Sequence, residues 1–192
     1  MLNQTRALAV AGMFVLGSLA LACEENGSYR SNSVNANKPV GPSQVTQSDR
    51  EFAIKAAMGG KHEVELGRLA ADRASDSDVK AFANRMIQDH SRAGDELTQT
   101  NSRLGIRAPD EDEASFKQMV DGLSKLKGVE FDRAYMSEMV EDHMKDLSEI
   151  ESYAKGDNNP ELKAWAAKTV PIVREHLQQA QSVAAKIGAQ KK

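Results

Sequence analysis

The chain contains very little of several residue types, and each shortage excludes a class of protein. One cysteine in 192 residues excludes a disulfide framework and metal sites built from several cysteines. Aromatic residues make up only 5%, and glycine and proline together supply 18 residues, a composition that favours helices. Basic residues do not predominate either, because 25 Lys and Arg stand against 28 Asp and Glu. The resulting net charge of −3 excludes a strongly basic nucleic-acid binder.

The segment 1–22 is expected to be a secretory signal peptide. A charged start precedes an almost wholly apolar run over residues 7–22, which is shorter than the roughly 20 residues that a membrane span needs. The end of this run fits two kinds of processing. Ala20 and Ala22 suit ordinary signal-peptidase cleavage, whereas the stretch ending at Cys23 resembles a bacterial lipoprotein box with Cys23 as the lipidated residue.

We favour lipidation of Cys23, because an exposed free thiol in a secreted protein is open to oxidation. The expected location is therefore the bacterial cell envelope, in the periplasm, with a lipid anchor on Cys23 in the outer membrane; a soluble secreted protein is the alternative. Residues 23–47 are rich in Asn, Ser, Gly and Pro and are expected to form a disordered tether. The anchor is the expected contact with the membrane, no nucleic-acid partner is expected, and the sequence does not identify a protein partner.

Residues 48–192 are expected to form one domain that contains four long helices. Apolar residues recur at steps of three or four over four segments, about 48–73, 77–104, 129–155 and 160–187. Ser48 and Glu51 have the spacing of a capping box at the first helix. A short helix is predicted from Asp110 to Lys125, within the long link between the second and third helices.

The lengths of the links predict the topology. Two short links create two helical hairpins, and one long crossover joins them, which is the ferritin-type arrangement. Met58 and His62 reappear as Met139 and His143, so the two hairpins look like copies of one unit. The expected fold class is all-α: a ferritin-like four-helix bundle with a long crossover that carries a short fifth helix.

Each long helix contains one histidine in its apolar stripe, close to its midpoint. These histidines are His62, His90, His143 and His176. Midpoints of packed helices lie at one level whichever way the helices run, so four imidazoles are expected to meet in one layer. Glu65 and Asp146 each follow a histidine by three residues and are expected to complete or bridge the site. Asp89, Asp142 and Glu175 each directly precede a histidine and are expected to hydrogen-bond to the ligands from outside.

This cluster predicts a site for a transition metal. Buried imidazoles and carboxylates without partners are costly, and a cation would offset that cost. The donor set suits zinc, iron, manganese or copper, with a role in binding, storage or sensing. Two alternatives remain: a metal-free structural or stress-related envelope module, and a di-metal oxidase or peroxide scavenger. No catalytic residues are predicted, because the sequence contains no recognisable nucleophile or phosphate-binding loop.

Residues 52–188 resemble the bacterial exported family called domain of unknown function 4142. Six stretches carry the resemblance: HEVELG from His62, VKAFA from Val79, MIQDH from Met86, FDRAY from Phe131, MVEDH from Met139 and EHL from Glu175. The resemblance implies a ferritin-like bundle in the envelope and supplies no function. Ferritin-like di-iron proteins use Glu-x-x-His motifs, but Ile87 and Val173 stand where those glutamates would be. Ferroxidase activity is therefore not carried over.

Overall fold

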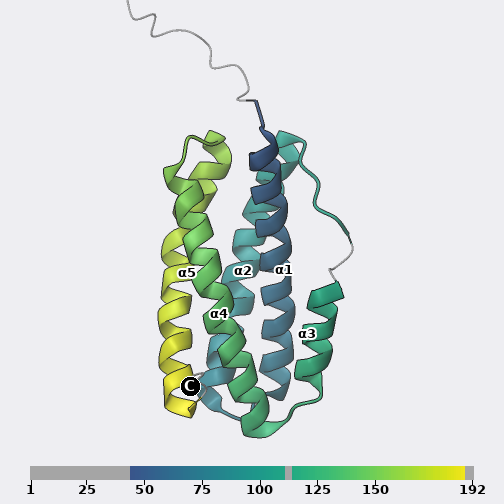
Figure 1. Cartoon of the computed structure of the whole chain (residues 1–192), viewed down its shortest axis with the longest axis vertical. Helices are drawn as coiled ribbons and strands as arrows, with labels where there is room; N and C mark the ends of the chain where they lie inside the picture. Colours follow the sequence, from purple (N-terminus) through teal and green to yellow (C-terminus); the bar gives the residue numbers. More distant parts are fainter. Residues whose placement is uncertain (1–43, 111–113, 189–192) are drawn as a thin grey trace, which may run out of the picture. The chain divides into compact units, whose positions relative to one another are not determined.

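The computed structural model describes residues 44–110 and 114–188, which form a bundle of helices (Figure 1). The helices are α1 (Gln47–Arg73), α2 (Ser77–Leu104), α3 (Ala114–Ser124), α4 (Gly128–Lys155) and α5 (Pro160–Ile187). No strand occurs among the described residues. The predicted ferritin-like bundle, with its short helix in the crossover, is confirmed. The predicted signal peptide, Cys23 and most of the tether lie outside the described residues.

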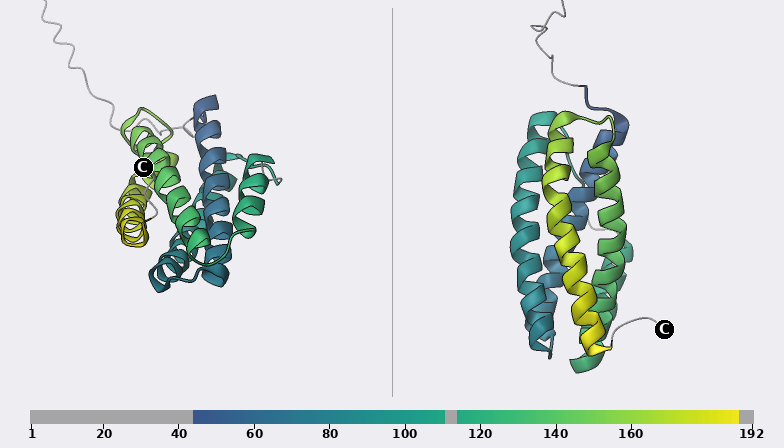
Figure 2. Two further views of the ribbon diagram at one scale, coloured as in Figure 1. Left: turned by 60° about the horizontal axis from the view of Figure 1, so that its bottom comes forward. Right: turned by 90° about the vertical axis from the view of Figure 1, so that its left-hand side faces the viewer.

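The four long helices are arranged as a square, in which α1, α2, α5 and α4 contact one another in turn. The hairpins α1–α2 and α4–α5 make the most extensive contacts, and packing of α2 on α5 and of α1 on α4 joins them. Figure 2 shows α5 flanked by α2 and α4. The crossover helix α3 lies outside this square, against α1 and α4. Side chains near the middle of each long helix can therefore meet at the bundle axis.

The ends of the four long helices agree with the sequence signals except at the start of α1, and the short helix α3 begins at Ala114 rather than at the predicted Asp110. The capping box there joins Thr46 to Asp49, whose side chains bond each other's backbone N–H groups. The predicted pair of Ser48 and Glu51 is wrong, because the helix begins at Gln47 and both residues lie within it. The chain therefore enters the helix two residues earlier than the predicted cap.

Two buried aspartates tie each hairpin to the link of the other one. Asp49 in α1 accepts a hydrogen bond from the backbone N–H of Asn159, which caps α5 (3.0 Å). Asp132 in α4 accepts one from the backbone N–H of Asp76, which caps α2 (2.9 Å). Asp132 follows Asp49 by 83 residues, and Asn159 follows Asp76 by 83 residues. This reciprocal contact supports the interpretation of the two hairpins as copies of one unit.

The apolar core is divided into two clusters along the bundle. One cluster includes Leu66, Phe82, Met86, Phe131, Tyr135, Met139 and Ala180. The other includes Phe52, Leu97, Ile150, Tyr153, Leu162, Trp165 and Val173. On all four long helices, one buried polar residue stands between the positions that belong to the two clusters: Glu63, His90, His143 and His176. We call these four residues the central layer.

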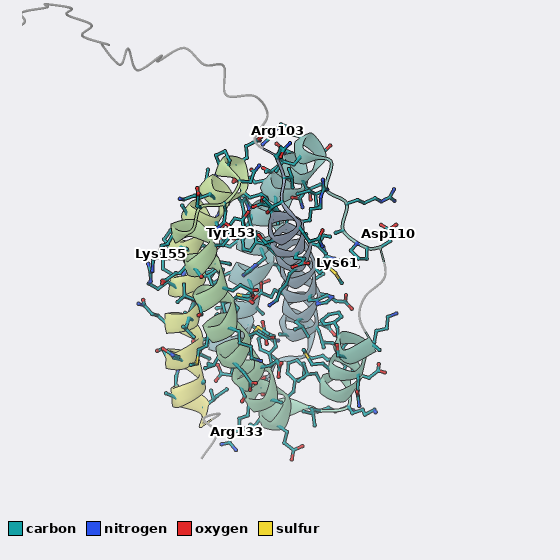
Figure 3. All side chains as sticks on the ribbon, turned by 45° about the horizontal axis from the view of Figure 1, so that its top comes forward. Lys61, Arg103, Asp110, Arg133, Tyr153 and Lys155 are labelled. Carbon is teal, nitrogen blue, oxygen red and sulfur yellow. The ribbon has the colours of Figure 1, made fainter. Side chains whose placement is uncertain are left out.

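Charged side chains cover the outside of the bundle (Figure 3). Arg103 pairs with Glu161 at 2.9 Å and Lys155 with Glu151 at 3.2 Å, both as exposed ion pairs that contribute little stability. Of the helices in the described ranges, none combines the length and the apolar character needed to cross a membrane.

Gly67 marks the closest approach of α1 to α2. A Cβ at this position would lie 2.9 Å from Ile87 Cγ1 and 3.2 Å from the Ala83 carbonyl oxygen. We expect Gly67→Ala to lower the free energy of unfolding by about 1–2 kcal/mol, because overpacking outweighs the better helix propensity of alanine. Urea unfolding measures this change. Gly122→Ala in α3, where a Cβ meets nothing within 4 Å, is the matched control and should not destabilise.

Candidate metal centre

Three histidines from three helices meet in the middle of the bundle. His90 on α2, His143 on α4 and His176 on α5 each offer a ligand atom, and these atoms lie within 4.8 Å of one another. The rings of His143 and His176 are fully buried, and His90 is 9% exposed. Within the part of the chain that the structure describes, this is the one group of at least three His, Cys, Asp or Glu side chains with that spacing.

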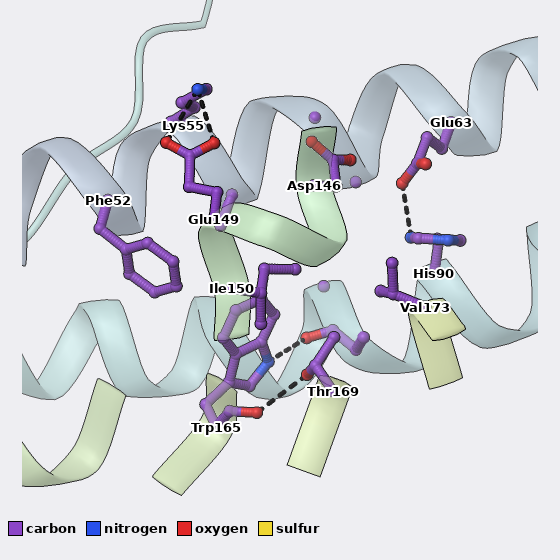
Figure 4. A pocket seen from close by; sticks show the side chains of 15 residues that line it. Phe52, Lys55, Glu63, His90, Asp146, Glu149, Ile150, Trp165, Thr169 and Val173 are labelled. Atoms are coloured by element: carbon purple, nitrogen blue, oxygen red, sulfur yellow. Dashed lines mark hydrogen bonds and ion pairs between the residues drawn. The ribbon is translucent and has the colours of Figure 1, made fainter. Parts of the chain in front are cut away.

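The first helix adds a carboxylate to this group. Glu63 is 5% exposed, and its Oε2 lies 2.8 Å from His90 Nδ1. Its other oxygen, Oε1, lies 3.3 Å from His143 Nε2. Figure 4 shows Glu63 on α1 facing His90 on the adjacent helix α2. The central layer therefore contains three imidazoles and one carboxylate, one from each long helix.

The structure does not bring His62 and Glu65 into the central layer, which corrects the expected four-histidine arrangement. The His62 ring stacks on the Phe116 ring of α3, with centroids 3.6 Å apart. Glu65 is exposed on the surface. Successive residues of a helix point about 100° apart, so Glu63 faces the axis while its neighbour His62 faces α3.

Sequence reasoning missed Glu63 because it followed a stripe through Met58 and His62. The buried face of α1 includes Phe52 and Ala70, which lie 11 residues before and 7 residues after Glu63. Those separations are close to three and two full helical turns. A stripe that counted the small residues of α1 as core positions would have placed Glu63 at its centre.

Each imidazole of the central layer donates one N–H to an acceptor. The pairs are His143 Nδ1 with the Met139 carbonyl (2.9 Å), His176 Nε2 with Asp89 (2.9 Å) and His90 Nδ1 with Glu63 (2.8 Å). With one proton on each ring, these acceptors fix its tautomer and leave the second nitrogen available to a further proton or to a metal ion.

The remaining lone pairs face one another. His90 Nε2 lies 3.2 Å from His176 Nδ1. His143 Nε2 and Glu63 Oε1 are buried, and neither has a hydrogen-bond partner. Such an arrangement of acceptors needs a positive charge among them, either a proton or a metal ion.

The charges of the central layer follow from burial and from its single carboxylate. Burial alone would raise the pKa of Glu63, but the surrounding His90 and His143 rings lower it to about 2. Burial lowers the pKa of His90, yet the adjacent Glu63 carboxylate raises it above the ordinary value overall. Burial lowers the pKa of His143, and it lowers that of His176 to about 4. With the further proton on His90 and no metal bound, the layer thus contains an ion pair and two neutral rings.

The acids expected around the site have different surroundings. Asp89 hydrogen-bonds to His176, whereas Glu175 is exposed and pairs with Arg85 at 2.5 Å. Asp146 is half-buried; burial and the Glu63 charge raise its pKa to about 7. Asp142 is also half-buried, and burial together with Glu138 raises its pKa to about 6. Glu175 is therefore paired with Arg85 at the surface and does not belong to the buried layer.

Two hollows reach Glu63 from the surface. A groove of about 590 Å³ between α1, α3 and α4 is lined by His62, Asp142, Asp146 and Glu63 among others. A smaller cavity of about 50 Å³ lies between the long helices and reaches both Glu63 and His90 (Figure 4). Both hollows therefore border the central layer, although its side chains are buried.

Comparison with known proteins gives a family and a fold. Residues 34–183 match the family described as "Domain of unknown function (DUF4142)". A DUF305 fragment from Deinococcus radiodurans superimposes with a TM-score of 0.65 and 16% identity, over 74% of this chain and 98% of that one. A DUF305 protein from Streptomyces coelicolor gives 0.62 and 15%, over 73% and 94%.

A third solved structure names the fold. It is a two-domain protein from Anabaena variabilis with DJ-1/ThiJ/PfpI-like and ferritin-like domains, with a TM-score of 0.50 and 17% identity over 78% of this chain and 40% of that one. At these identities the likeness shows a ferritin-like helical fold alone. No curated protein matches the chain in sequence.

Proposed function

The chain belongs to the DUF4142 family, and we propose that its bundle binds one transition-metal ion in the central layer. The ligands are His90, His143, His176 and Glu63. Three imidazoles and one carboxylate suit zinc, iron, manganese or copper. Asp89 and the Met139 carbonyl orient two of the rings by accepting their other N–H groups.

One observation carries this proposal. Glu63 Oε1 and His143 Nε2 are buried acceptors 3.3 Å apart, and neither has a hydrogen-bond partner. Two lone pairs that face each other in a buried site repel, and each has lost its water. A cation bound by both atoms would remove that penalty and would also use the inward nitrogens of His90 and His176.

The site supports binding, storage or sensing of metal better than di-metal oxidation. Ferritin-like di-iron sites take a glutamate from each of the four helices. In this bundle, α1 supplies the carboxylate of Glu63, which pairs with His90. Asp89 on α2 contacts His176 from the outer side of the ring. The donor set is thus rich in nitrogen and fits a single ion.

A metal-free structural layer is the second candidate. The raised pKa of His90 beside Glu63 favours it, because a protonated His90 can donate to both Glu63 and His176. Such a buried network would set the axial register of the four helices and would have no ligand.

Metal analysis of the purified protein tests both candidates. After expression in metal-replete cells, we expect about one equivalent of metal per chain and a rise in Tm on adding zinc, iron or copper. The variant His90→Ala/His143→Ala should lose both properties. Less than about a tenth of an equivalent in the wild type, with no thermal shift, would leave the structural layer as the better reading. Equal metal in the double variant would place the ion elsewhere.

We further propose that the protein acts in the bacterial envelope, attached to the outer membrane by lipid on Cys23. The apolar run over residues 7–22 and the position of Cys23 support this location. The DUF305 protein of S. coelicolor also has a provisional description as a secreted protein. Mass spectrometry of the N-terminal peptide should find acylated Cys23, and Cys23→Ser should move the protein from the membrane to the soluble fraction. An unmodified N-terminus at Cys23 would favour the soluble alternative.

A further inference from the structure

Three glycines in helix interiors have no structural reason to be glycine. Gly59 and Gly60 lie within α1 and Gly94 within α2, and none of them has a positive φ. A Cβ at any of the three would meet nothing within 4 Å, in contrast to Gly67. Glycine is among the least favourable residues inside a helix. These positions thus give up helix stability and leave space open.

The open space is one cavity beside the central layer. All three glycines line the same cavity of about 50 Å³, together with Ala56 and Ala93. Five small residues on two adjacent helices therefore enlarge the gap at one level of the bundle. An accumulation of this kind at a single cavity points to a space that holds a ligand.

The two ends of the cavity differ in chemistry. Glu63 and His90 of the central layer form its inner end. Lys55 and Glu149, which form an ion pair at 2.6 Å with side chains 67% and 41% exposed, line its outer side. A molecule in the cavity would thus contact the central layer directly while remaining close to solvent.

The remaining walls are mostly apolar, and Asp146 adds one half-buried carboxyl to them. Ile150 and Val173 contribute aliphatic surface. The indole N–H of Trp165 donates to the Ala93 carbonyl (3.0 Å), and the Thr169 hydroxyl donates to the Trp165 carbonyl (2.9 Å). Because these donors are already engaged, the cavity does not offer them to an anion, and the Glu63 carboxylate would repel one.

We propose that this cavity binds one small neutral molecule, a diatomic gas such as dioxygen. An engineered apolar cavity of about 150 Å³ binds benzene, so a third of that volume suits a diatomic molecule. The contact with Glu63 and His90 would place the bound molecule beside the metal of the proposed function. Occupation of the cavity itself does not require that metal.

Xenon is the probe, because it enters small apolar cavities and does not need the metal. We expect saturable xenon-dependent shifts in the methyl NMR signals of Ala56, Ala93, Ile150 and Val173 in the purified, chelator-treated protein. The variant Gly59→Ala/Gly60→Ala/Gly94→Ala should weaken this response by about tenfold or more, because its methyl groups occupy the space. The same variant should melt about 1–4 °C higher per substitution.

Gly122→Ala is the matched control, because its Cβ also meets nothing and Gly122 does not line the cavity. It should raise Tm to a similar degree per substitution and leave the xenon response unchanged. Linear, non-saturating shifts in the wild type, as expected if the space holds only water, would overturn the proposal. An undiminished response in the triple alanine variant would overturn it as well. Failure of metal binding alone would leave the xenon result intact, so the two proposals fail separately.

Discussion

Glu63→Gln is expected to reduce metal affinity by about 100-fold or more, whereas Glu65→Gln leaves it unchanged. Both substitutions remove one negative charge from the same helix, two residues apart. Glu63 contacts His90 and His143 in the buried layer, but Glu65 is exposed. Competition of zinc with a chromophoric chelator measures the affinities. A loss of affinity in Glu65→Gln, with Glu63→Gln unaffected, would refute the assignment of the inner face of α1.

The same variant separates the metal site from a metal-free structural layer. In Glu63→Gln, the amide oxygen can accept from His90 Nδ1. The amide nitrogen takes the place of Glu63 Oε1, which lies 3.3 Å from His143 Nε2, and it can donate to that nitrogen. If the metal-free layer leaves Glu63 Oε1 and His143 Nε2 as facing acceptors, as the metal site predicts, the Glu63→Gln protein without metal should be at least as stable as the wild type. If the layer is structural, loss of the counter-charge of His90 should destabilise it. Thermal unfolding in the presence of a chelator distinguishes these outcomes.

The fold could be predicted from sequence because its signals are local. Helix period, the Asn159–Pro160 start of α5 and the glycine after Leu104 each act within a few residues, and the structure places helix boundaries there. The relative lengths of the links then fix which helices form hairpins. The start of α1 was misplaced because Thr46 and Ser48 are both good capping residues, and the tertiary contacts of Asp49 favour Thr46.

The sequence predicts the level of the candidate site along the bundle axis, but only partly the direction in which each side chain points. The midpoint argument placed His90, His143 and His176 at one level, and these three meet. It placed His62 at the right level as well, but one residue along a helix changes the direction by about 100°. Apolar stripes define direction poorly in α1, where alanines and glycines occupy much of the buried face.

Contacts between helices were beyond sequence reasoning. Asp89 is expected to hydrogen-bond to a ligand from outside, but the sequence does not specify which one; in the structure it bonds to His176 on α5. The reason is that a side chain at the α2–α5 interface lies closer to groups on the facing helix than to its neighbours on the same helix. Which residues face each other there depends on the axial offset of the two helices, and no local signal specifies that offset.

Asp49→Ala is expected to lower the free energy of unfolding by about 3–4 kcal/mol. The Asp49 carboxylate is 1% exposed and accepts hydrogen bonds from the backbone N–H groups of Thr46 (2.8 Å) and Asn159 (3.0 Å) and from the Tyr153 hydroxyl. Removing it leaves buried donors without acceptors, at about 1–3 kcal/mol each, and separates the α4–α5 link from α1. Urea unfolding at neutral pH measures the loss. The exposed Asp72 on the same helix is the control, and Asp72→Ala should change stability by less than about 0.5 kcal/mol.

Acid should remove part of this difference, and the direction follows from the pKa of Asp49. Burial would raise this pKa, but the hydrogen bonds from Tyr153, Asn159 and Thr46 lower it from 3.8 to about 2. A carboxyl whose pKa is lowered on folding stabilises the protein above the unfolded pKa and loses that effect as the pH falls towards the folded one. The stability difference between wild type and Asp49→Ala should therefore be full at pH 5 and smaller by about 2 kcal/mol near pH 2. Because every other acid is common to both proteins, an equal difference at the two pH values would show that Asp49 is not held as a carboxylate by these donors.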